Sequence, residues 1–466
     1  MPGKSDQANH HEHNPQWDVI VIGAGPGGTT AAGLLAEQGF RTLVLEKQVF
    51  PREMIGESLL PALMPVLDRL GVKPTEDTYV YKRGARFVCE DTEREQAFHF
   101  PQSPSGGAKH AWHVDRARFD LQLRDRAREL GADVRHGETV TDAGADEHFA
   151  WVETRTGRFT GRYLIDASGQ SRLLARRNEA VVPYTRFGAC SVYTHFDNAQ
   201  TELLGPDFDI RIMLRPDGWG WIIPLPGKRL SVGIVAKHKI AQPFLDDGLL
   251  AGPLCQRLTA GAERRETKVV GNFSYKNSVP CGPRFAAAGD AACFLDPVFS
   301  SGVTLALRGA ADLVDVLAPA LREGREADKD LLGKFQQSMD RAYGTFSGLV
   351  ERFYNTHFAE SYFLGSDLGD ELRNGVMSVL AGDVWRRDNT FQDMLLRSRR
   401  RPGRRPAGLQ AAQAQRDPAQ RDPAQRDPAE PNQMERDRTE QDSTEPDFTG
   451  RDLTARDRSP SNGPSN

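Results

Sequence analysis

The clearest pattern of hydrophobic and polar positions lies near the N-terminus. An apolar, β-rich run from Trp17 is followed by a glycine-rich turn, a helical stretch of small residues and a second apolar run that ends at Glu46. This order predicts a strand, a helix and a second strand, which is the unit that holds the ADP part of a dinucleotide. Residues 111–135 also predict a strand, an amphipathic helix and a strand, with Asp115 near the start of the helix and Gly131 at its end.

Between these two segments the pattern is weaker. Apolar residues at helical spacing predict a helix from Gly56 to Gly71. Residues 82–89 and 97–100 are typical of short strands.

The pattern changes after Gly169. Five closely spaced apolar runs predict a mostly antiparallel sheet, at residues 188–196, 208–214, 220–224, 230–236 and 267–275. Residues 284–292 return to the style of a buried parallel strand, and residues 303–396 are typical of helices with turns near Gly324, Gly344 and Gly365. We therefore expect the sheet to be inserted into a nucleotide-binding domain whose last part lies far along the chain from its first.

Composition and charge narrow the range of partners. The chain has 466 residues and a formal net charge of −4, from 60 basic and 64 acidic residues, so it has no broad field that would attract nucleic acid or an acidic membrane surface. No apolar run precedes Trp17, so we expect neither a signal peptide nor a membrane helix, and a cytoplasmic location. Five dispersed cysteines without a CxxC pair indicate reduced thiols, and we expect no bound metal.

The last part of the chain has a different composition. From Arg397 it is basic, then it repeats QRDPA three times and stays polar, charged and interrupted by proline to Asn466. Such a stretch cannot bury enough apolar surface to offset the entropy lost on ordering, so we predict a disordered tail.

The glycine turn is the first candidate site. Gly23, Gly25 and Gly28 form a GxGxxG pattern directly after a strand and at the start of a helix. Gly23 permits the tight turn, Gly25 lets the backbone approach a pyrophosphate, and Gly28 allows close helix packing. Glu46 has about the spacing needed to accept hydrogen bonds from ribose hydroxyls, which argues against the alternative of a glycine turn without a ligand.

The sequence has only one such fingerprint, so a second built-in NAD(P)H domain is missing and the electrons must come from elsewhere. Asp290 follows the late strand and precedes the helix from Val303. In flavoproteins of this organisation a carboxylate at this place holds the ribityl hydroxyls, while the alternative is a simple helix-capping aspartate.

These pieces together resemble a known group of flavoproteins. The nucleotide fingerprint, the VDRARFD segment with Arg116, the DASG turn from Asp166 to Gly169 and the GD pair at Asp290 are similar to the FAD-binding parts of p-hydroxybenzoate-hydroxylase-like enzymes. The segment PREMIGESLLP, which contains Ser58, resembles a flavin-flanking segment.

Within that group the resemblance is to the flavin-dependent halogenases. The segment from Trp219 to Pro224 matches the WxWxIP motif of this family at every fixed position, and the segment from Phe294 to Gly302 matches its FxxPxxSxG motif. The resemblance spans about residues 18–363.

The resemblance implies a fold class and a cofactor. We expect an α/β chain with a discontinuous Rossmann-like FAD domain, an inserted mostly antiparallel sheet that forms a substrate domain, a C-terminal helical region and a disordered tail. The expected boundaries are a disordered N-terminus at 1–15, the FAD domain at 16–80, 110–175 and 280–325, the substrate domain at 81–109 and 176–279, the helical region at 326–396 and the tail at 397–466. The expected cofactor-binding residues are Gly23, Ala24, Gly25, Gly28, Glu46, Lys47, Ser58, Arg116, Asp290 and Pro297.

The two tryptophans of WxWxIP allow a physical reading of their own. Trp219 and Trp221 alternate along a strand, so their indoles would stand side by side on one face as a wall. Such a wall beside a flavin would keep an organic substrate away from the flavin oxygen. The alternative is two core tryptophans that only pack.

The helix start in FxxPxxSxG is a candidate anion site. Ser300, Ser301 and Gly302 precede a predicted helix, so their amides would be free donors. The resemblance implies that chloride or bromide binds at Ser301 and Gly302, and the alternative is a helix N-terminus without a ligand.

Lys82 is the candidate catalytic residue. It lies in TYVYKRGARF, and phenol and pyrrole halogenases that resemble this chain carry a catalytic lysine before a glycine and a phenylalanine, which Gly84 and Phe87 match. An ammonium could hydrogen-bond hypochlorous acid, whereas a neutral amine could form a chloramine. A solvated strand lysine is the alternative; Lys47 and Arg83 are nearby basic residues that we do not assign to this role.

The C-terminal helices bear on the substrate. The segment from Arg352 to Phe363 resembles the corresponding region of bacterial phenol and pyrrole halogenases. Tryptophan halogenases carry a glutamate before their Ser/Thr-Gly pair, where this chain has Ser300. Tryptophan is therefore a poor substrate candidate, and the base that removes the ring proton has no candidate.

The resemblance thus implies a two-component halogenase. A separate flavin reductase would supply FADH2, and O2 with chloride or bromide would give a hypohalous acid. Lys82 would direct this oxidant onto an electron-rich phenol or pyrrole, either free or tethered to an acyl or peptidyl carrier protein. A flavin monooxygenase or isoprenoid reductase of the same superfamily is the alternative enzyme, and a non-catalytic flavin-binding or redox-sensing module is the alternative of another class.

Overall fold

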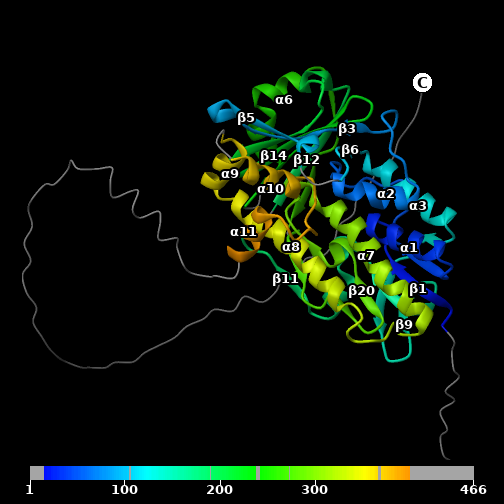
Figure 1. Ribbon diagram of the computed structural model, residues 1–466. Helices are drawn as coiled ribbons and strands as arrows, with labels where there is room; N and C mark the ends of the chain where they lie inside the picture. The colour runs from blue at the N-terminus through cyan, green and yellow to red at the C-terminus, as the bar shows by residue number, and fades with distance from the viewer. Residues whose placement is uncertain are drawn as a thin grey trace, which may run out of the picture. The chain divides into compact units, whose positions relative to one another are not determined.

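The structure is a computed structural model that describes residues 15–103, 107–188, 190–237, 242–271, 273–365 and 369–398. These residues form the predicted α/β fold, with a mainly parallel nucleotide-binding sheet, a second mostly antiparallel sheet and C-terminal helices (Figure 1). The predictions of terminal disorder lie outside the described residues, except that α11 (Thr390–Ser398) includes the first two residues assigned to the tail.

The nucleotide-binding sheet has the strand order β19-β20-β10-β1-β2-β7. Its parallel strands are β1 (Trp17–Ile22), β2 (Thr42–Glu46), β7 (Asp133–His136), β10 (Arg158–Asp166) and β20 (Phe285–Ala287). The antiparallel strands β8 (Val140–Ala145), β9 (Ala150–Thr154) and β19 (Cys281–Gly282) extend it. Leu164 of β10 pairs with Phe285 of β20, so the last strand does return from far along the chain.

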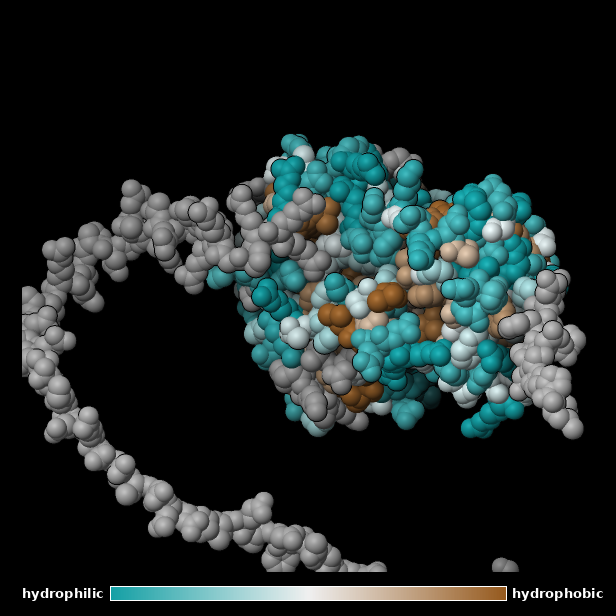
Figure 2. All heavy atoms as spheres, turned by 90° about the horizontal axis from the view of Figure 1, so that it is seen from below, coloured by the Kyte–Doolittle hydropathy of each residue, from teal (hydrophilic) through white to brown (hydrophobic). Residues whose placement is uncertain are grey.

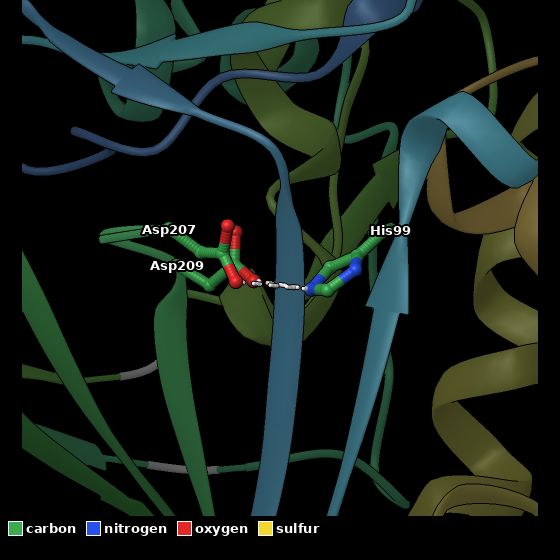
Figure 3. A group of neighbouring side chains, drawn as sticks. All are labelled: His99, Asp207 and Asp209. Atoms are coloured by element: carbon green, nitrogen blue, oxygen red, sulfur yellow. Dashed lines mark ion pairs between the residues drawn. The ribbon is translucent and has the colours of Figure 1, made fainter. Parts of the chain in front are cut away.

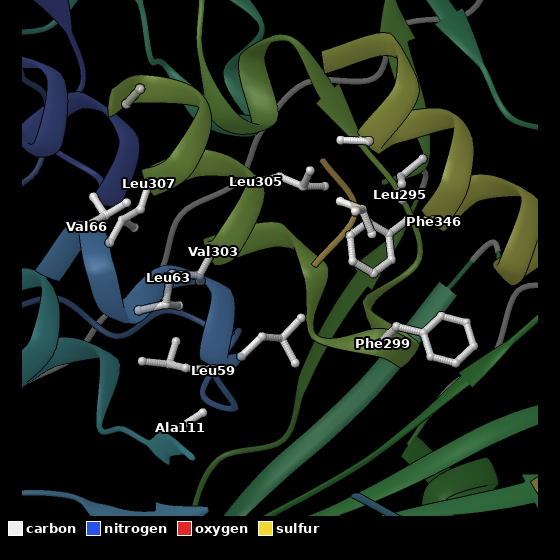
Figure 4. Close-up of a cluster of buried hydrophobic side chains, with 14 of the residues drawn as sticks. Leu59, Leu63, Val66, Ala111, Leu295, Phe299, Val303, Leu305, Leu307 and Phe346 are labelled. Atoms are coloured by element: carbon white, nitrogen blue, oxygen red, sulfur yellow. The ribbon is translucent and has the colours of Figure 1, made fainter. Parts of the chain in front are cut away.

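Three helices pack together beside this sheet: α1 (Pro26–Glu37), α3 (Arg116–Glu129) and α7 (Ser301–Glu323). Gly27 permits the close approach of α1 and α7, because a Cβ there would lie 3.3 Å from the backbone oxygen of Ala306. Figure 4 shows part of the apolar core along α7, where Val303 and Leu307 lie near Leu63 and Val66.

The second sheet has the order β16-β12-β15-β14-β13-β4-β5, with β17 also paired to β12. Its strands are β4 (Gly84–Cys89), β5 (Arg94–His99), β12 (Cys190–Asp197), β13 (Ile210–Arg215), β14 (Gly218–Leu225), β15 (Arg229–Ala236), β16 (Glu263–Arg264) and β17 (Lys268–Gly271). Neighbouring strands are antiparallel except β4 and β13. The predicted mostly antiparallel sheet is therefore present.

Two predicted strands are wrong in extent. The strand expected at 267–275 divides, because β18 (Tyr275–Asn277) leaves β17 and joins a small sheet with β11 (Val181–Pro183) and β21 (Cys293–Phe294). The strand expected at 82–89 breaks at Arg83, so that β3 (Val80–Lys82) pairs with β6 (Ala111–His113) while β4 belongs to the large sheet. Lys82 therefore lies on a separate two-stranded ribbon.

Two helix predictions also need correction. The helix expected from Gly56 begins later, as a 3-10 turn η1 (Pro61–Leu63) that leads into α2 (Met64–Leu70), but it ends at Gly71 as predicted. The helix α8 (Gly333–Phe353) runs through Gly344 without the expected turn. A Cβ at Gly344 would lie 3.0 Å from Leu396, so this glycine serves close packing against α11.

The remaining helices are α4 (Leu173–Arg177), α5 (Gln242–Leu245), α6 (Pro253–Leu258), α9 (Thr356–Phe363) and α10 (Asp370–Leu380). The face seen in Figure 2 is largely hydrophilic, with hydrophobic residues in patches across its middle. Among the described residues, no helix combines the length and apolar character needed to cross a membrane.

Candidate active site

The glycine turn has the geometry that the GxGxxG pattern predicts. Gly23 has φ 97°, and a Cβ at Gly28 would lie 2.0 Å from the Gly23 carbonyl oxygen, so neither position accepts another residue. Gly25 is different, because the nearest protein atom to a Cβ there is Nη2 of Arg52, at 3.5 Å. Gly23 and Gly28 are thus packed against backbone atoms, whereas the turn leaves space beside Gly25, at the N-terminus of α1.

Glu46 is fixed at the same turn. Its Oε2 accepts a hydrogen bond of 2.8 Å from the Ala24 amide, and its Oε1 accepts one of 2.8 Å from the Gln48 amide. The side chain is buried, yet each carboxylate oxygen keeps a lone pair for a further donor. Lys47 is exposed and its Nζ donates to Ser171 Oγ at 2.9 Å, beside the DASG turn.

A buried group of charges lies behind the turn, formed by Arg52, Arg116 and Asp120, which we call the Arg116 network. Arg116 donates to both carboxylate oxygens of Asp120, at 2.8 and 3.0 Å, and to the Ile55 carbonyl at 2.5 Å. Nη2 of Arg52 lies 3.4 Å from Asp120. These donors compensate the Asp120 charge on two sides.

Asp290 lies in the 3-10 turn after β20, against the first part of α7. Burial raises the pKa of its carboxyl to about 6, and the positive charge of Arg116 opposes this rise. The glycine turn, Glu46, Arg116 and Asp290, which are far apart in sequence, therefore meet along the edge of one sheet.

The two tryptophans of β14 lie side by side, as their spacing predicts. Their ring centroids are 5.7 Å apart and both indoles are buried. Trp221 donates to Ser231 Oγ at 3.1 Å, and Tyr193 of β12 continues the row, 6.0 Å from Trp221. Gly233 makes room for this row, because a Cβ there would lie 2.3 Å from the Trp221 ring.

The helix α7 begins at Ser301, five residues after Asp296, whose carboxylate accepts a hydrogen bond from the Trp219 indole. Ser300 adopts a left-handed conformation with φ 55°, and Pro297 opens the 3-10 turn η8 (Pro297–Phe299) before it. Ser301 is buried, while a Cβ at Gly302 would have no protein atom within 4 Å. Open space thus adjoins the first turn of a 23-residue helix, where backbone amides are unpaired.

Lys82 is not a surface lysine. Its side chain is 1% exposed, and its Nζ donates to Ser58 Oγ and to the Leu59 carbonyl, both at 2.8 Å. Burial lowers the pKa of Lys82 to about 7, and the negative charge of Asp209 opposes this fall. The hydroxyl oxygen of Ser58, a residue that we expected to bind the cofactor, thus accepts a hydrogen bond from Lys82.

Further polar side chains surround this lysine: we call Ser58, Lys82, His99, His113 and Asp209 the Lys82 cluster. Asp209 is fully buried, and neither of its carboxylate oxygens has a hydrogen-bond partner among the described residues. Figure 3 shows it facing His99, whose Nε2 lies 3.2 Å from Asp209 and 3.7 Å from Asp207. Burial raises the pKa of Asp209, while His99 and Lys82 oppose this rise.

Within the described residues, His99, Asp207 and Asp209 have a spacing that could hold a metal ion. The two carboxylates already have positive neighbours, however. Arg83 lies 3.1 Å from Asp207, and Lys82 interacts with Asp209. This charge balance needs no added cation.

Comparison with known proteins decides the family. A family model described as tryptophan halogenase matches residues 18–102 and 89–374. The chain belongs to this halogenase family. The name describes the model and not the substrate of this chain.

Curated relatives agree with the assignment. The flavin-dependent halogenase armH3 of Armillaria mellea is 31% identical over 383 residues, which cover 72% of this chain and 74% of the relative. The 1H-pyrrole-2-carbonyl-(peptidyl-carrier protein) chlorinase of Pseudomonas fluorescens is 27% identical over 406 residues, which cover 79% of this chain and 90% of the relative.

Solved structures agree as well. A flavoprotein/dehydrogenase from Cytophaga hutchinsonii has a TM-score of 0.74 at 30% identity, covering 82% of this chain and 96% of that chain. The myxobacterial chondrochloren halogenase CndH has a TM-score of 0.65 at 27% identity, covering 82% and 96%. This halogenase is therefore a flavin-dependent enzyme with FAD as cofactor. Its membership of the halogenase family separates it from the monooxygenase, isoprenoid reductase and non-catalytic alternatives, which also bind flavin.

The residues of this halogenase fit FAD. The space beside Gly25 leaves room for a pyrophosphate at the N-terminus of α1, and Glu46 keeps acceptors for hydroxyl donors. The Asp290 side chain has no hydrogen bond from the described residues and remains available as an acceptor at the sheet edge. The predicted cofactor-binding residues stay a prediction.

Two buried residues of this halogenase have no counterpart among the expected site residues. Asp296 accepts from the Trp219 indole at 3.0 Å and from the Tyr354 hydroxyl at 2.5 Å, so it joins the wall to the C-terminal helices. Glu57 lies 2.5 Å from His195 Nε2. Asp296 occupies a variable position of the FxxPxxSxG motif, so the motif did not identify it as a site residue. The one signal in the sequence was a carboxylate within an apolar run.

Proposed function

We propose that the chain is the halogenating component of a two-component system. In this system a separate flavin reductase supplies FADH2, and O2 with chloride or bromide gives a hypohalous acid. Lys82 directs the oxidant onto an electron-rich phenol or pyrrole. The observation that carries the proposal is the burial of Lys82, whose pKa lies near 7, in a chain that also has two buried, neighbouring tryptophans and an open helix start at Ser301.

In this proposal the cofactor site and the halide site adjoin each other. Gly25, Glu46, Arg116 and Asp290 would hold the cofactor, which when bound as FADH2 would supply the two electrons that activate O2, the oxidant of the halide. The amides of Ser301 and Gly302 hold the halide, because the unpaired donors and the positive end of α7 favour an anion.

The wall keeps oxidant formation apart from oxidant use. Trp219 and Trp221 present packed aromatic surface with both indole hydrogens already donated, so they offer no polar site to a substrate. Exclusion of the substrate from the flavin side disfavours hydroxylation and favours a small oxidant that moves to Lys82.

Lys82 can act in either of two protonation states, because its pKa is near 7. Two N–H donors are used by Ser58 and Leu59, so an ammonium keeps one hydrogen for the oxidant, whereas a neutral amine keeps a lone pair that could form a haloamine. Both states deliver an electrophilic halogen.

The substrate class rests on two observations. The chlorinase relative is named for a pyrrole-2-carbonyl group on a peptidyl carrier protein, which supports a pyrrole that is tethered. Ser300 stands where tryptophan halogenases carry a glutamate, which argues against tryptophan. A phenol, free or carrier-bound, is the second candidate.

The test is a reconstituted reaction. The purified full chain would be supplied with FAD, a flavin reductase, NADH, O2 and chloride or bromide, together with phenols and pyrroles, both free and loaded on a carrier protein. Mass spectrometry should show a product with the halogen isotope pattern. A hydroxylated product without halogen from every substrate would overturn the proposal.

A further inference from the structure

A buried imidazole in the Lys82 cluster has a free basic nitrogen. His113 is fully buried, and its Nε2 lies 3.0 Å from the carbonyl oxygen of Phe208. Since a carbonyl only accepts, Nε2 carries the hydrogen. The other ring nitrogen, Nδ1, has no hydrogen-bond partner among the described residues and therefore keeps its lone pair.

The backbone holds this arrangement in place. Phe208 has φ 44°, a left-handed conformation that is uncommon outside glycine. Burial lowers the pKa of His113, and the charge of Lys82 lowers it further, so the ring stays neutral. A buried acceptor left without a partner is costly in a stable core and is characteristic of reactive sites.

His113 lies on the same face of the ribbon as Lys82. In the pairing of β3 with β6, Lys82 is opposite Ala111 and Val80 is opposite His113. Side chains two residues apart point to one face, so Lys82, Ala111 and His113 share it.

Ser58 brings the lysine ammonium toward His113. Ser58 bridges to His113 on the other side of β6, and its hydroxyl accepts from Lys82 Nζ. The lysine side chain therefore crosses β6 over the small side chain of Ala111, which Figure 4 shows beside Leu59, and ends next to His113.

We propose that Nδ1 of His113 is the base that removes the ring proton after the halogen has added to the substrate. This inference rests on the proposed halogenation at Lys82. In the step, the C–H bond at the halogenated carbon breaks, its electron pair returns to the ring, and the proton bonds to Nδ1.

The protons balance over the cycle. The Lys82 ammonium gives a proton to the hydroxide that leaves the hypohalous acid as water, and His113 takes one proton from the ring. Return of that proton from His113 to Lys82 restores both groups, so the net change is hypohalous acid and arene to haloarene and water. Asp209 forms an ion pair with His99 at 3.2 Å and stays as the counter-charge.

The test uses a substitution that separates the two ring nitrogens. His113→Gln keeps an amide donor for Phe208 but has no basic nitrogen at the Nδ1 position. Single turnovers would be followed with phenol and pyrrole-2-carboxamide, each unlabelled and ring-deuterated. We expect halogenation to slow by about 10²-fold, the lower end of the range for a general base, and a primary deuterium isotope effect that the wild type lacks.

Two controls accompany this variant. Formation of hypohalous acid, measured by halogenation of monochlorodimedone, should be unchanged. His110→Gln, the same change at a half-buried histidine near the ribbon, should leave the rate and the isotope effect as in the wild type. An unchanged rate and isotope effect in His113→Gln, or the isotope effect appearing in Asp209→Asn instead, would overturn the inference.

A second measurement needs no substrate. Nitrogen-15 NMR of the wild-type holoenzyme near neutral pH should show His113 as the neutral tautomer with the hydrogen on Nε2. Hydrogen on Nδ1 would overturn the inference. A wild-type enzyme that halogenates no phenol or pyrrole would instead remove the proposed function on which the inference rests.

Discussion

The Arg116 network and the Lys82 cluster are both buried and charged, yet they differ in how their polar atoms are paired. The Arg116 guanidinium donates to a carboxylate with both ends and to a backbone carbonyl. In the Lys82 cluster, both oxygens of Asp209 and one nitrogen of His113 lack a hydrogen bond among the described residues, and Asp209 forms an ion pair with His99 at 3.2 Å.

This difference separates a support from a reactive site. Paired charges hold a fixed geometry at little cost, since each loses its water but gains hydrogen bonds. Unpaired groups keep their capacity to bind an oxidant or a proton, and burial shifts the pKa of Lys82 to where both protonation states are available. Substitutions in the network should therefore affect stability, and those in the cluster should affect chemistry.

The largest effect is expected for Lys82→Met. Loss of the amine should reduce halogenated product by about 10²- to 10⁴-fold, because the proposed function assigns delivery of the oxidant to this amine. Bound flavin, measured by absorbance, should stay constant, and the midpoint of thermal unfolding should not fall, since a buried amine is replaced by an apolar chain. Lys73→Met, at an exposed lysine, is the matched control; product retained in Lys82→Met would show that another group directs the halogen.

Asp120→Ala tests the Arg116 network, where we expect a loss of stability. It leaves Arg116 and Arg52 without their shared carboxylate, and removing one partner of a buried pair costs about 3–5 kcal/mol of unfolding free energy. Urea unfolding would measure this loss. Asp125→Ala, at an exposed acid of the same helix, should change the unfolding free energy by less than about 1 kcal/mol, and an equal loss in both would refute a special role of the network.

The pH dependence of halogenation should report Lys82. If the ammonium is the active form, the rate falls as the pH rises through about 7, because the amine loses its proton there. Asp209→Asn removes a charge that raises the pKa of Lys82, so the falling limb should move to lower pH. Rates of hypohalous acid formation measured in parallel should not show this shift; a limb that rises with pH would identify the neutral amine as the active form.

The smallest effect on stability is expected for Gly302→Ala. No protein atom lies within 4 Å of the new methyl group, so the unfolding free energy should change by at most about 1 kcal/mol. The methyl group would instead occupy the space proposed for halide, and the KM for chloride should rise. Gly28→Ala is the contrasting variant, because its methyl group would meet the Gly23 carbonyl and should prevent flavin binding. An unchanged KM for chloride in Gly302→Ala would show that the halide does not bind at Gly302.

The sequence predicted local features well. The strand, glycine turn and helix at the N-terminus, the pairing of the two indoles and the stop at Gly71 each depend on residues close together in the chain, where spacing determines geometry. Lys82 was identified only through its resemblance to a family motif.

The environment of Lys82 could not be predicted in the same way. Its contact with Ser58 joins residues 24 positions apart, and the contact of His113 with Phe208 joins residues 95 positions apart. The break at Arg83 has a similar origin: a Cβ at Gly84 would lie 2.0 Å from the Phe98 carbonyl, a tertiary contact that no local pattern reveals. Burial, which gives the lysine its chemistry, is set by segments that pack from elsewhere.

The pairing of β10 with β20 has a consequence for biosynthesis. Leu164 and Phe285 are about 120 residues apart, so the nucleotide-binding sheet lacks two of its strands, β19 and β20, until the inserted sheet has been translated. At about 5–20 residues per second, a ribosome leaves that edge of β10 without β20 for roughly 10 s. The edge of β10 is thus open to other chains during that interval, and the predicted FAD site is complete only after Asp290 has been added.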